Sequence, residues 1–259
     1  MDLSIIIVNY KSKIKLINCL DSIKRSDLSG ISYEVVIVEN NSGDDLSDLS
    51  SQYRVIISDQ NLGMGGGNNL GIKNSNGDYI LISNPDIVYE SDTIKKLFNY
   101  FSSHPEIGLI GPKLLNPDGS LQYSCLRFPK FYIPVLRRTF VGRFFPKSLS
   151  YYLMESSSHE EVATVNWLLG ACFMVRRLEL NNDQLFDERY FMYFEDVDLG
   201  RQVSGRGQVV VYYPLVKVIH DHVRQSASLP WYRSLFQDKI AREHLKSAFK
   251  YFNKWRKIK

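Results

Sequence analysis

Four apolar runs, each of the length of one buried β-strand, dominate the first third of the chain. Residues 4–8 read SIIIV, and similar runs occupy residues 34–38, 54–58 and 79–83. Runs with several consecutive apolar residues, rather than alternating ones, suit a parallel sheet, which is covered on both faces. Segments with helical spacing lie after the first run, at residues 13–25, and after the fourth, at residues 91–102, where Ser91 is the expected N-cap. The alternation predicts a doubly wound α/β fold.

The later part of the chain is less regular. We expect strands at residues 109–111, 122–126, 167–175, 209–212 and 216–219, and a helix from about residue 195. We find no linker rich in Pro, Gly or Ser and no internal repeat. We therefore predict one continuous domain at residues 1–225 and a basic, amphipathic helical extension at residues 226–259.

Composition limits the class of protein. Hydrophobic residues make up 44% and charged residues 23% of the 259, as in soluble globular proteins. No apolar run approaches the ~20 residues that span a bilayer, and the N-terminus has no signal-peptide pattern, so we expect a cytoplasmic protein. The three cysteines are far apart and suggest neither a zinc site nor a disulfide framework.

Charge is unevenly distributed. Residues 230–259 contain nine Lys or Arg and two acids, whereas the whole chain has a net charge of +4. Residues 119–154 contain no acid and carry six basic residues among many aromatics: Arg127, Lys130, Arg137, Arg138, Arg143 and Lys147. A basic tail predicts an anionic partner, either a membrane or a nucleic acid.

Polar residues follow the predicted strands at their carboxyl ends, where ligands bind in α/β sheets. Asn9 and Tyr10 end the first run, Glu39 ends the second, and Asn84-Pro85-Asp86 ends the fourth. Asn, Pro and Asp are also common turn formers, so residues 83–86 alone favour a simple turn. Three polar clusters at one sheet edge favour a binding site instead.

The stretch NLGMGGGNNLGI, residues 61–72, is predicted to be a glycine-rich loop that leads into a short helix. It follows the third strand rather than the first and lacks the GxGxxG and GxxxxGK spacings, which argues against a dinucleotide fingerprint or a P-loop. We expect a loop that contacts a nucleotide or sugar through its backbone and through Asn68 and Asn69. A purely structural turn is the alternative.

Two further positions carry ionisable side chains. Glu195-Asp196-Val197-Asp198 lies at a helix start, where acids are often only favourable charges near the helix dipole. The preceding YFMYF is aromatic, and burial beside it would raise a carboxyl pKa toward that of a usable base. His220 ends a strand, and an Asp with a His suits Mg²⁺ or Mn²⁺ better than zinc.

Six motifs in order give a family resemblance: SIIIVNYK, VVIVENNSGD, NLGMGGGNNLGI, GDYILISNPDI, WLLGACFMVRR and FDERYFMYFEDVDLGRQV. Together they resemble a family 2 glycosyltransferase over residues 3–225, with bacterial rhamnosyltransferases of surface-polysaccharide (O-antigen type) synthesis as the most similar branch. The resemblance implies the GT-A fold, with a mixed, mainly parallel sheet flanked by helices. It also implies inverting transfer of a sugar from a nucleotide-diphosphate donor.

The resemblance assigns roles to single residues. Asp196 is the implied catalytic base and Glu39 the implied nucleoside contact. Asp86 is the implied ligand of Mg²⁺ or Mn²⁺, with Asn84 in place of a first Asp, and His220 fits the remaining metal position better than His222. Trp167, Gly170 and Glu195 are assigned to the acceptor, although Trp167 would serve equally as core. The donor nucleotide is assigned to Asn9, Tyr10, Glu39, Asn41, Asn61, Gly65, Asn68, Asn69, Asn84 and Asp86.

The implied partners are dTDP-L-rhamnose as donor and a saccharide acceptor, which is expected to be lipid-linked. The C-terminal helix is expected either to contact the inner face of the membrane or to pack on its own domain or a second subunit in a homodimer. Alternatives are a hexosyltransferase that uses a UDP-sugar and a non-catalytic nucleotide-sugar-binding protein. A nucleic-acid partner is disfavoured because no base-stacking module or known motif is present.

Overall fold

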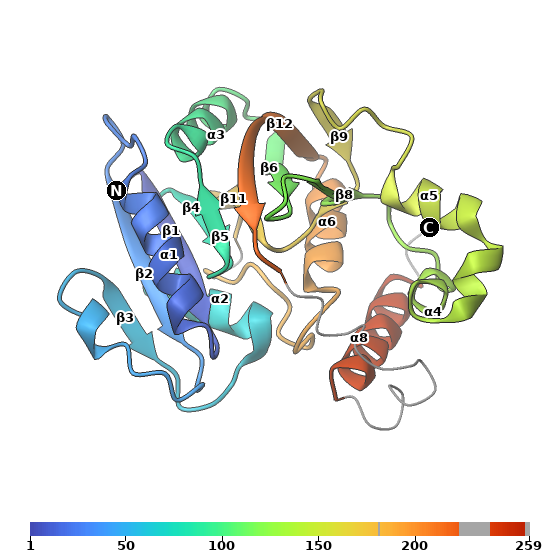
Figure 1. The fold of residues 1–259 in the computed structure, drawn as a ribbon, viewed down its shortest axis with the longest axis horizontal. Coiled ribbons are helices and arrows are strands. Elements are labelled where there is room, and N and C mark those ends of the chain that lie inside the picture. The colour runs from blue at the N-terminus through green and yellow to red at the C-terminus, as the bar shows by residue number, and fades with distance from the viewer. Residues whose placement is uncertain (181, 223–238, 257–259) are drawn as a thin grey trace.

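The computed structural model describes residues 1–180, 182–222 and 239–256 (Figure 1). A ten-stranded sheet forms the centre of the molecule. Its main path runs in the order β3 (Arg54–Ile57), β2 (Tyr33–Glu39), β1 (Leu3–Asn9), β4 (Tyr79–Ser83), β11 (Cys172–Arg176), β6 (Ile107–Leu115), β12 (Val209–His220) and β5 (Ile87–Tyr89). β7 (Leu121–Gln122) pairs with β6, and β9 (Ala163–Val165) pairs with β12. A separate pair joins β10 (Trp167–Leu168) to β8 (Cys125–Leu126).

The sheet is mixed, as the resemblance implies. β1 is parallel to β2 and β4, and β2 is parallel to β3, so the carboxyl ends of all four strands lie at one edge. β11 runs antiparallel to both β4 and β6, whereas β6 and β12 are parallel. The four apolar runs therefore form the predicted strands, and their polar ends share one edge of the sheet.

Helices cover both faces of the sheet. They are α1 (Lys13–Lys24), α2 (Gly63–Lys73), α3 (Thr93–Ser102), α4 (Ile133–Arg138), α5 (Pro146–Leu153), α6 (Glu195–Gly205) and α8 (Lys239–Trp255), with short 3₁₀ turns η1 (Ser47–Leu49), η2 (Phe140–Phe144) and η3 (Arg177–Glu179). One core cluster joins α1 and α3 to one sheet face, through residues such as Leu16 and Phe101. A second joins α2 and α6 to the opposite face, through residues such as Ile72 and Leu199.

Several predicted boundaries were wrong. Residues 167–175 form two strands rather than one, because the chain leaves β10 at Leu169 and enters the main sheet only at Cys172. Residues 209–220 form one strand rather than two, with an irregular register between Tyr213 and Lys217. α3 begins at Thr93, preceded by Asp92, so Ser91 is not its N-cap.

α8 packs on the protein's own domain. Its residues Ala248 and Tyr251 are 6% and 0% exposed and join a third core cluster with Tyr152, Trp167 and Phe194. Of the two roles expected for this helix, membrane contact or packing on its own domain, the described part of the tail adopts the packing. Trp231 and Leu235, which contribute to the predicted amphipathic pattern, lie outside the described residues. Within the part of the chain that the structure describes, no helix is long and apolar enough to cross a membrane.

The glycine-rich stretch is helical rather than a loop, because α2 starts at Gly63. Its glycines allow the helix to lie close to the sheet. A Cβ at Gly67 would be 2.9 Å from Val8 Cγ1, and one at Gly71 would be 2.4 Å from Ile6 Cγ2. At Gly65 an added Cβ would be 3.1 Å from Phe186 Cβ. Gly67 and Gly71 therefore serve helix–sheet packing, and Gly65 allows close contact with Phe186.

We predict that Gly71→Ala lowers the free energy of unfolding by about 1–3 kcal/mol, because the new methyl group overpacks the contact with Ile6. The matched control is Gly205→Ala, also in a helix, where no atom lies within 4 Å of the added Cβ. The control should leave stability unchanged or slightly raised, since it only removes backbone freedom. Urea unfolding measures both, and equal midpoints would contradict this account of α2.

Candidate functional site

The turn between β4 and β5 holds Asp86 in place. The backbone N–H of Asn84 donates to the carbonyl of Ala171 at 2.8 Å, and the N–H of Ile87 donates to the carbonyl of Asn84 at 3.3 Å. The N–H of Asp221 donates to the carbonyl of Asp86 at 3.0 Å. Together with the fixed φ of Pro85, these bonds anchor the turn to β11 on one side and to the end of β12 on the other.

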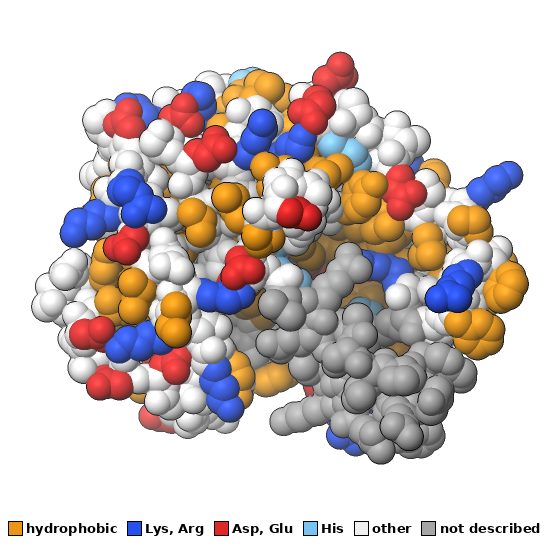
Figure 2. Space-filling view, in the orientation of Figure 1, with side chains coloured by type: hydrophobic (Ala, Val, Ile, Leu, Met, Phe, Trp, Pro, Cys, Tyr) orange, Lys and Arg blue, Asp and Glu red, His pale blue; other side chains and the backbone are white. Residues whose placement is uncertain are grey.

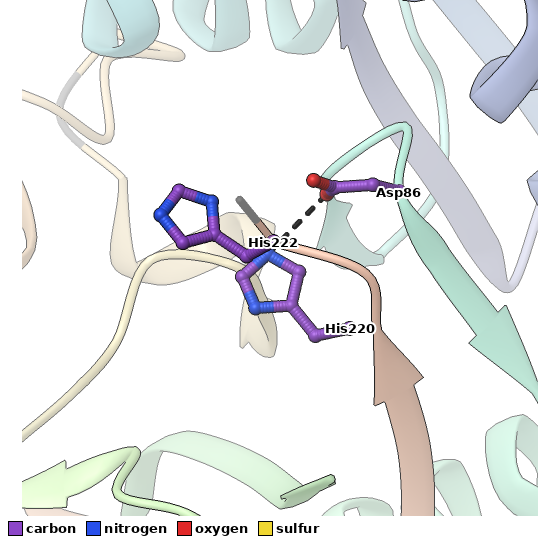
Figure 3. Close-up of side chains that lie close together, drawn as sticks. All are labelled: Asp86, His220 and His222. Carbon is purple, nitrogen blue, oxygen red and sulfur yellow. Dashed lines mark ion pairs between the residues drawn. The ribbon is translucent and has the colours of Figure 1, made fainter. Parts of the chain in front are cut away.

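His220, the last residue of β12, faces Asp86 (Figure 3). Its Nε2 lies 3.3 Å from Asp86 Oδ1. Its Nδ1 lies 2.6 Å from Gln122 Oε1, and the Gln122 amide is oriented by its own N–H bond to Asn116 Oδ1 at 3.1 Å. Because the Gln122 oxygen is an acceptor, this network places a proton on Nδ1, and in that tautomer the Nε2 lone pair would face the carboxylate.

These two ligand atoms fit a divalent cation. Asp86 Oδ1 and His220 Nε2 are both buried and have no hydrogen-bond partner, and two facing acceptors are satisfied by a metal ion between them. His222 stacks on His220 with ring centroids 5.2 Å apart. One ligand atom from each of Asp86, His220 and His222 lies within 4.8 Å of the others. The structure thus brings both histidines to Asp86.

Asp196 occupies the first turn of α6. Its Oδ2 accepts the N–H of Gly170 at 3.1 Å, and its Oδ1 accepts the N–H of Val197 at 2.8 Å. Burial raises the pKa of Asp196 to about 6, although the Gly170 and Val197 hydrogen bonds act in the opposite direction. A carboxyl group with this pKa is ionised at neutral pH and basic enough to accept a proton.

The neighbouring acid behaves differently. Glu195 is 7% exposed, and its Oε2 has no hydrogen-bond partner. Burial, followed by the nearby Asp196 carboxylate, raises the pKa of Glu195 well above its usual value. These two effects favour the neutral form of Glu195 and so favour the negative charge of the pair on Asp196.

Backbone strain marks the approach to α6. Tyr193 and Phe194 both have φ of 68°, in the left-handed region that bulky side chains rarely adopt. Such strain persists only where the surroundings enforce it. Here the aromatic YFMYF segment turns sharply, which places Asp196 beside Gly170.

The β4–β11 contact joins the two carboxylates. Asn84, two residues before Asp86, is bonded to Ala171, and Gly170, one residue before Ala171, is bonded to Asp196. A Cβ at Gly170 would be 3.5 Å from Asp196 Oδ2, so a glycine leaves this approach free. The resemblance assigned Gly170 to the acceptor, and in the structure its N–H donates to Asp196, the predicted base.

The ends of β1 and β2 hold other predicted donor residues. Asn9 is fully buried; its Nδ2 donates to Asp44 Oδ2 at 2.9 Å, and its Oδ1 has no partner. Tyr10 is 45% exposed at the same edge. Glu39 is buried and accepts hydrogen bonds from the Ser42 N–H at 2.7 Å and from the Ser42 hydroxyl, which shapes the turn after β2.

The predicted asparagines make protein contacts. Asn41 Nδ2 donates to the Asp59 carbonyl at 2.6 Å, and Asn61 Oδ1 accepts the Gly63 N–H at 2.9 Å. Asn68 Nδ2 donates to the Met64 carbonyl at 2.9 Å, but Asn68 Oδ1 is buried without a partner. Asn69 binds Phe186 through both amide atoms. Donor binding by these residues stays a prediction.

Trp167 belongs to the core. It is 4% exposed, and its Nε1–H donates to the Arg127 carbonyl at 2.8 Å. Of the two roles expected for Trp167, acceptor contact or core packing, the structure supports core packing. Sequence reasoning also missed Gln122, which selects the tautomer of His220. No local sequence motif indicates a role for Gln122, because this residue reaches the site only through the pairing of β7 with β6.

A buried carboxylate network ties α8 to α6. Asp198 is fully buried and accepts hydrogen bonds from Lys254 Nζ and Trp255 Nε1, each at 2.6 Å, and from Gln202 Nε2 at 2.7 Å. Tyr190 OH also donates to it at 3.3 Å. Asp198 lies two residues after Asp196, so α8 stabilises the helix that carries the predicted base.

Comparison with known proteins identifies the family. The sequence pattern of a family described as glycosyl transferase family 2 matches residues 4–157. The chain belongs to this family. It is 34% identical over 155 residues to the N-acetylglucosaminyl-diphospho-decaprenol L-rhamnosyltransferase of Mycobacterium tuberculosis, covering 59% of this chain and 50% of that protein. The matched part of this protein thus spans about half the length of that curated relative.

A second relative covers more of both chains. The rhamnosyltransferase WbbL of Escherichia coli K12 is 27% identical over 257 residues, which is 95% of this chain and 91% of that protein. Among solved structures, the mannosyltransferase PcManGT of Pyrobaculum calidifontis, in complex with GDP-Man and Mn²⁺, has a TM-score of 0.63 at 16% identity. That match covers 97% of this chain and 64% of the other. It confirms the predicted GT-A fold.

We predict that Lys254→Met lowers the free energy of unfolding by about 3 kcal/mol, because it leaves the buried Asp198 carboxylate without its cation. Trp255 and Gln202 still donate to Asp198, so the loss of stability should fall at the lower end of the range for a buried ion pair that loses one partner. The matched control is Lys246→Met, which breaks the exposed pair with Glu243 and should cost less than about 1 kcal/mol. Equal losses in chemical unfolding would contradict a buried role for Lys254.

Proposed function

We propose that the chain is an inverting, metal-dependent glycosyltransferase that transfers a sugar from a nucleotide-diphosphate donor to a saccharide acceptor. The observation that carries the proposal is the arrangement around the β4–β11 contact, where one carboxylate faces two histidines and the other has a base-like pKa. The Mn²⁺ complex of the structural relative supports the metal requirement. Either Mg²⁺ or Mn²⁺ suits the Asp86 and His220 ligand set.

In the proposed reaction, Asp196 accepts the proton of an acceptor hydroxyl as its oxygen attacks the anomeric carbon of the donor sugar. The new carbon–oxygen bond forms on the face opposite the bond to the diphosphate, which breaks and leaves with its electron pair. When bound at Asp86 and His220, a divalent cation supplies positive charge to the departing diphosphate. Asn9, Tyr10 and Glu39 lie at the sheet edge proposed for the nucleoside.

For the substrates we propose L-rhamnose from dTDP-L-rhamnose as donor and a lipid-linked saccharide as acceptor, in cell-surface polysaccharide synthesis. Two rhamnosyltransferases among the relatives support the sugar, and the decaprenol-linked acceptor in the name of one supports the lipid. A hexosyltransferase that uses a UDP-sugar is the second candidate, because another relative is the poly(ribitol-phosphate) β-glucosyltransferase of Bacillus spizizenii. Thermal-shift measurements with both donors distinguish the two.

We further propose that residues 1–225 form the catalytic domain and that residues 226–259 form an extension that supports α6. The site of action is the cytoplasmic, inner face of the cell membrane, where a lipid-linked acceptor would be found. Lys254 and Trp255, which contact Asp198, support this role for the extension. A homodimer stays a prediction.

We predict that Asp196→Asn lowers kcat by about 10²–10⁴-fold and leaves donor binding intact, because only the proton acceptor is lost. In the wild type, kcat/KM should rise with pH up to about 6 and level off above it, since the pKa of Asp196 is about 6 and the ionised form is the base. Initial rates across pH measure this. Asp118→Asn, in an exposed turn, is the control.

Undiminished turnover in Asp196→Asn would reject the assignment of the base. A wild type that binds a nucleotide sugar but transfers nothing to any acceptor would instead be the non-catalytic binding protein considered above. The inverted pH profile, with activity lost as pH rises through about 6, would require a protonated Asp196 and contradict its role as a base.

We predict that Asp86→Ala abolishes the rise in melting temperature that donor and Mn²⁺ produce together, because the carboxylate ligand is removed. His220→Gln should weaken the same shift less, since His222 remains close to Asp86. The control is His104→Gln, a histidine at the end of α3 whose Nδ1 contacts the Tyr100 carbonyl. A donor-induced shift that survives in Asp86→Ala, or that persists in the wild type with chelator, would refute the metal site.

A further inference from the structure

Exposed aromatic and basic side chains gather on one end of the molecule. We name this surface the α4–α5 face and define it by Phe131, Val135, Arg143, Phe144, Lys147 and Tyr151, all of which are exposed. Phe131 and Phe144 are the most exposed, at 76% and 73%. Figure 1 places α4 and α5 at the end of the molecule opposite β3.

The charge of this surface has one sign. Residues 119–154 contain no Asp or Glu, so Arg143 and Lys147 have no acid within their own segment. Figure 2 shows hydrophobic and basic side chains together at the end of the molecule that α4 and α5 occupy. An exposed apolar patch with basic residues beside it has the composition of a surface that binds anionic lipid.

The α4–α5 face also leads toward the proposed base. A groove of about 280 Å³ opens between α4 and α5, lined by aromatic residues that include Tyr132 and Tyr152 and by Lys130 and Lys147. Tyr152 packs in one core cluster with Phe194 and Val197, the residues on either side of Glu195 and Asp196. This buried packing connects the α4–α5 face to the end of α6 that carries Asp196.

We infer that the α4–α5 face binds the surface of an anionic lipid bilayer. Phe131 and Phe144 enter the boundary between headgroups and acyl chains, and Arg143 and Lys147 contact lipid phosphates. A second copy of the chain is a poorer occupant, because a two-fold contact would bring the same basic residues against each other. The inference moves bilayer contact from the C-terminal helix, whose Tyr251 points into the core, to α4 and α5.

The test is sedimentation of the full chain with vesicles, in the absence of nucleotide sugar. Vesicles of phosphatidylglycerol and phosphatidylcholine are compared with vesicles of phosphatidylcholine alone. The face variant combines Arg143→Glu with Phe144→Ser. The matched control combines Arg54→Glu with Ile57→Ser on β3, where Ile57 is 76% exposed at the opposite end of the molecule. A third variant, Phe249→Ser, alters the residue of α8 that is 75% exposed.

We expect the wild type and both other variants to sediment with the anionic vesicles, and the face variant to partition roughly tenfold or more weakly, because each basic residue near an anionic surface contributes about 1 kcal/mol. Thermal unfolding should show that all variants remain folded. Salt should weaken wild-type binding.

Four results would overturn the inference. They are no sedimentation of the wild type, equal binding to neutral vesicles, equal binding of the face variant, and loss of binding in Phe249→Ser with retention in the face variant. A wild-type dimer that the face variant dissociates would assign the face to a second copy instead. The inference goes beyond the proposed function, and because the assay uses no donor, its failure leaves the thermal-shift and transfer results standing.

Discussion

The antiparallel pairing of β11 with β4 is the contact on which the site depends. Its register sets Cys172 opposite Ser83, so that the residues that follow β4 meet those that precede β11. From this meeting point one branch of the chain reaches Asp86, and the other positions Asp196 through Gly170. The parallel strands β1, β2 and β4 supply the edge, but parallel pairing alone would not bring residues 110 positions apart to one place. The backbone hydrogen bonds of this pairing thus hold the two segments together, and the bond from the Gly170 N–H to Asp196 Oδ2 positions the second carboxylate.

The sequence predicted the parallel half of the sheet well, because residues 5–8, 35–38 and 79–82 are apolar throughout and are each followed by a polar residue. It failed where tertiary contacts override local pattern. Residues 167–175 are continuously apolar, yet the chain breaks at Gly170 so that two strands join two sheets. The glycines of residues 63–71 suggested a loop, since glycine disfavours helices, but the close contact with Ile6 and Val8 requires them.

The site residues that local sequence pattern predicts differ in the same way from those that depend on distant contacts. Asp86 and Asp196 follow strand and helix boundaries that periodicity reveals, and His220 ends a strand. Gln122 could not be found, because its contact with His220 joins residues 98 positions apart. Amphipathic spacing in the tail was detected correctly, but such spacing is the same for a helix on a membrane and a helix on its own core.

The attachment of α8 also separates the two halves of the proposed chemistry. Ser247, Lys250, Lys254 and Trp255 bind residues 187–198, which precede and begin α6. The turn that carries Asp86 is held instead by β11 and β12. A protein shortened at its C-terminus would therefore lose the counter-cation of Asp198 while its nucleotide edge kept its own supports. Such a protein should still bind the donor, but the helix that carries Asp196 would be poorly supported. Removal of the tail would therefore impair the reaction itself and not only the location of the protein in the cell.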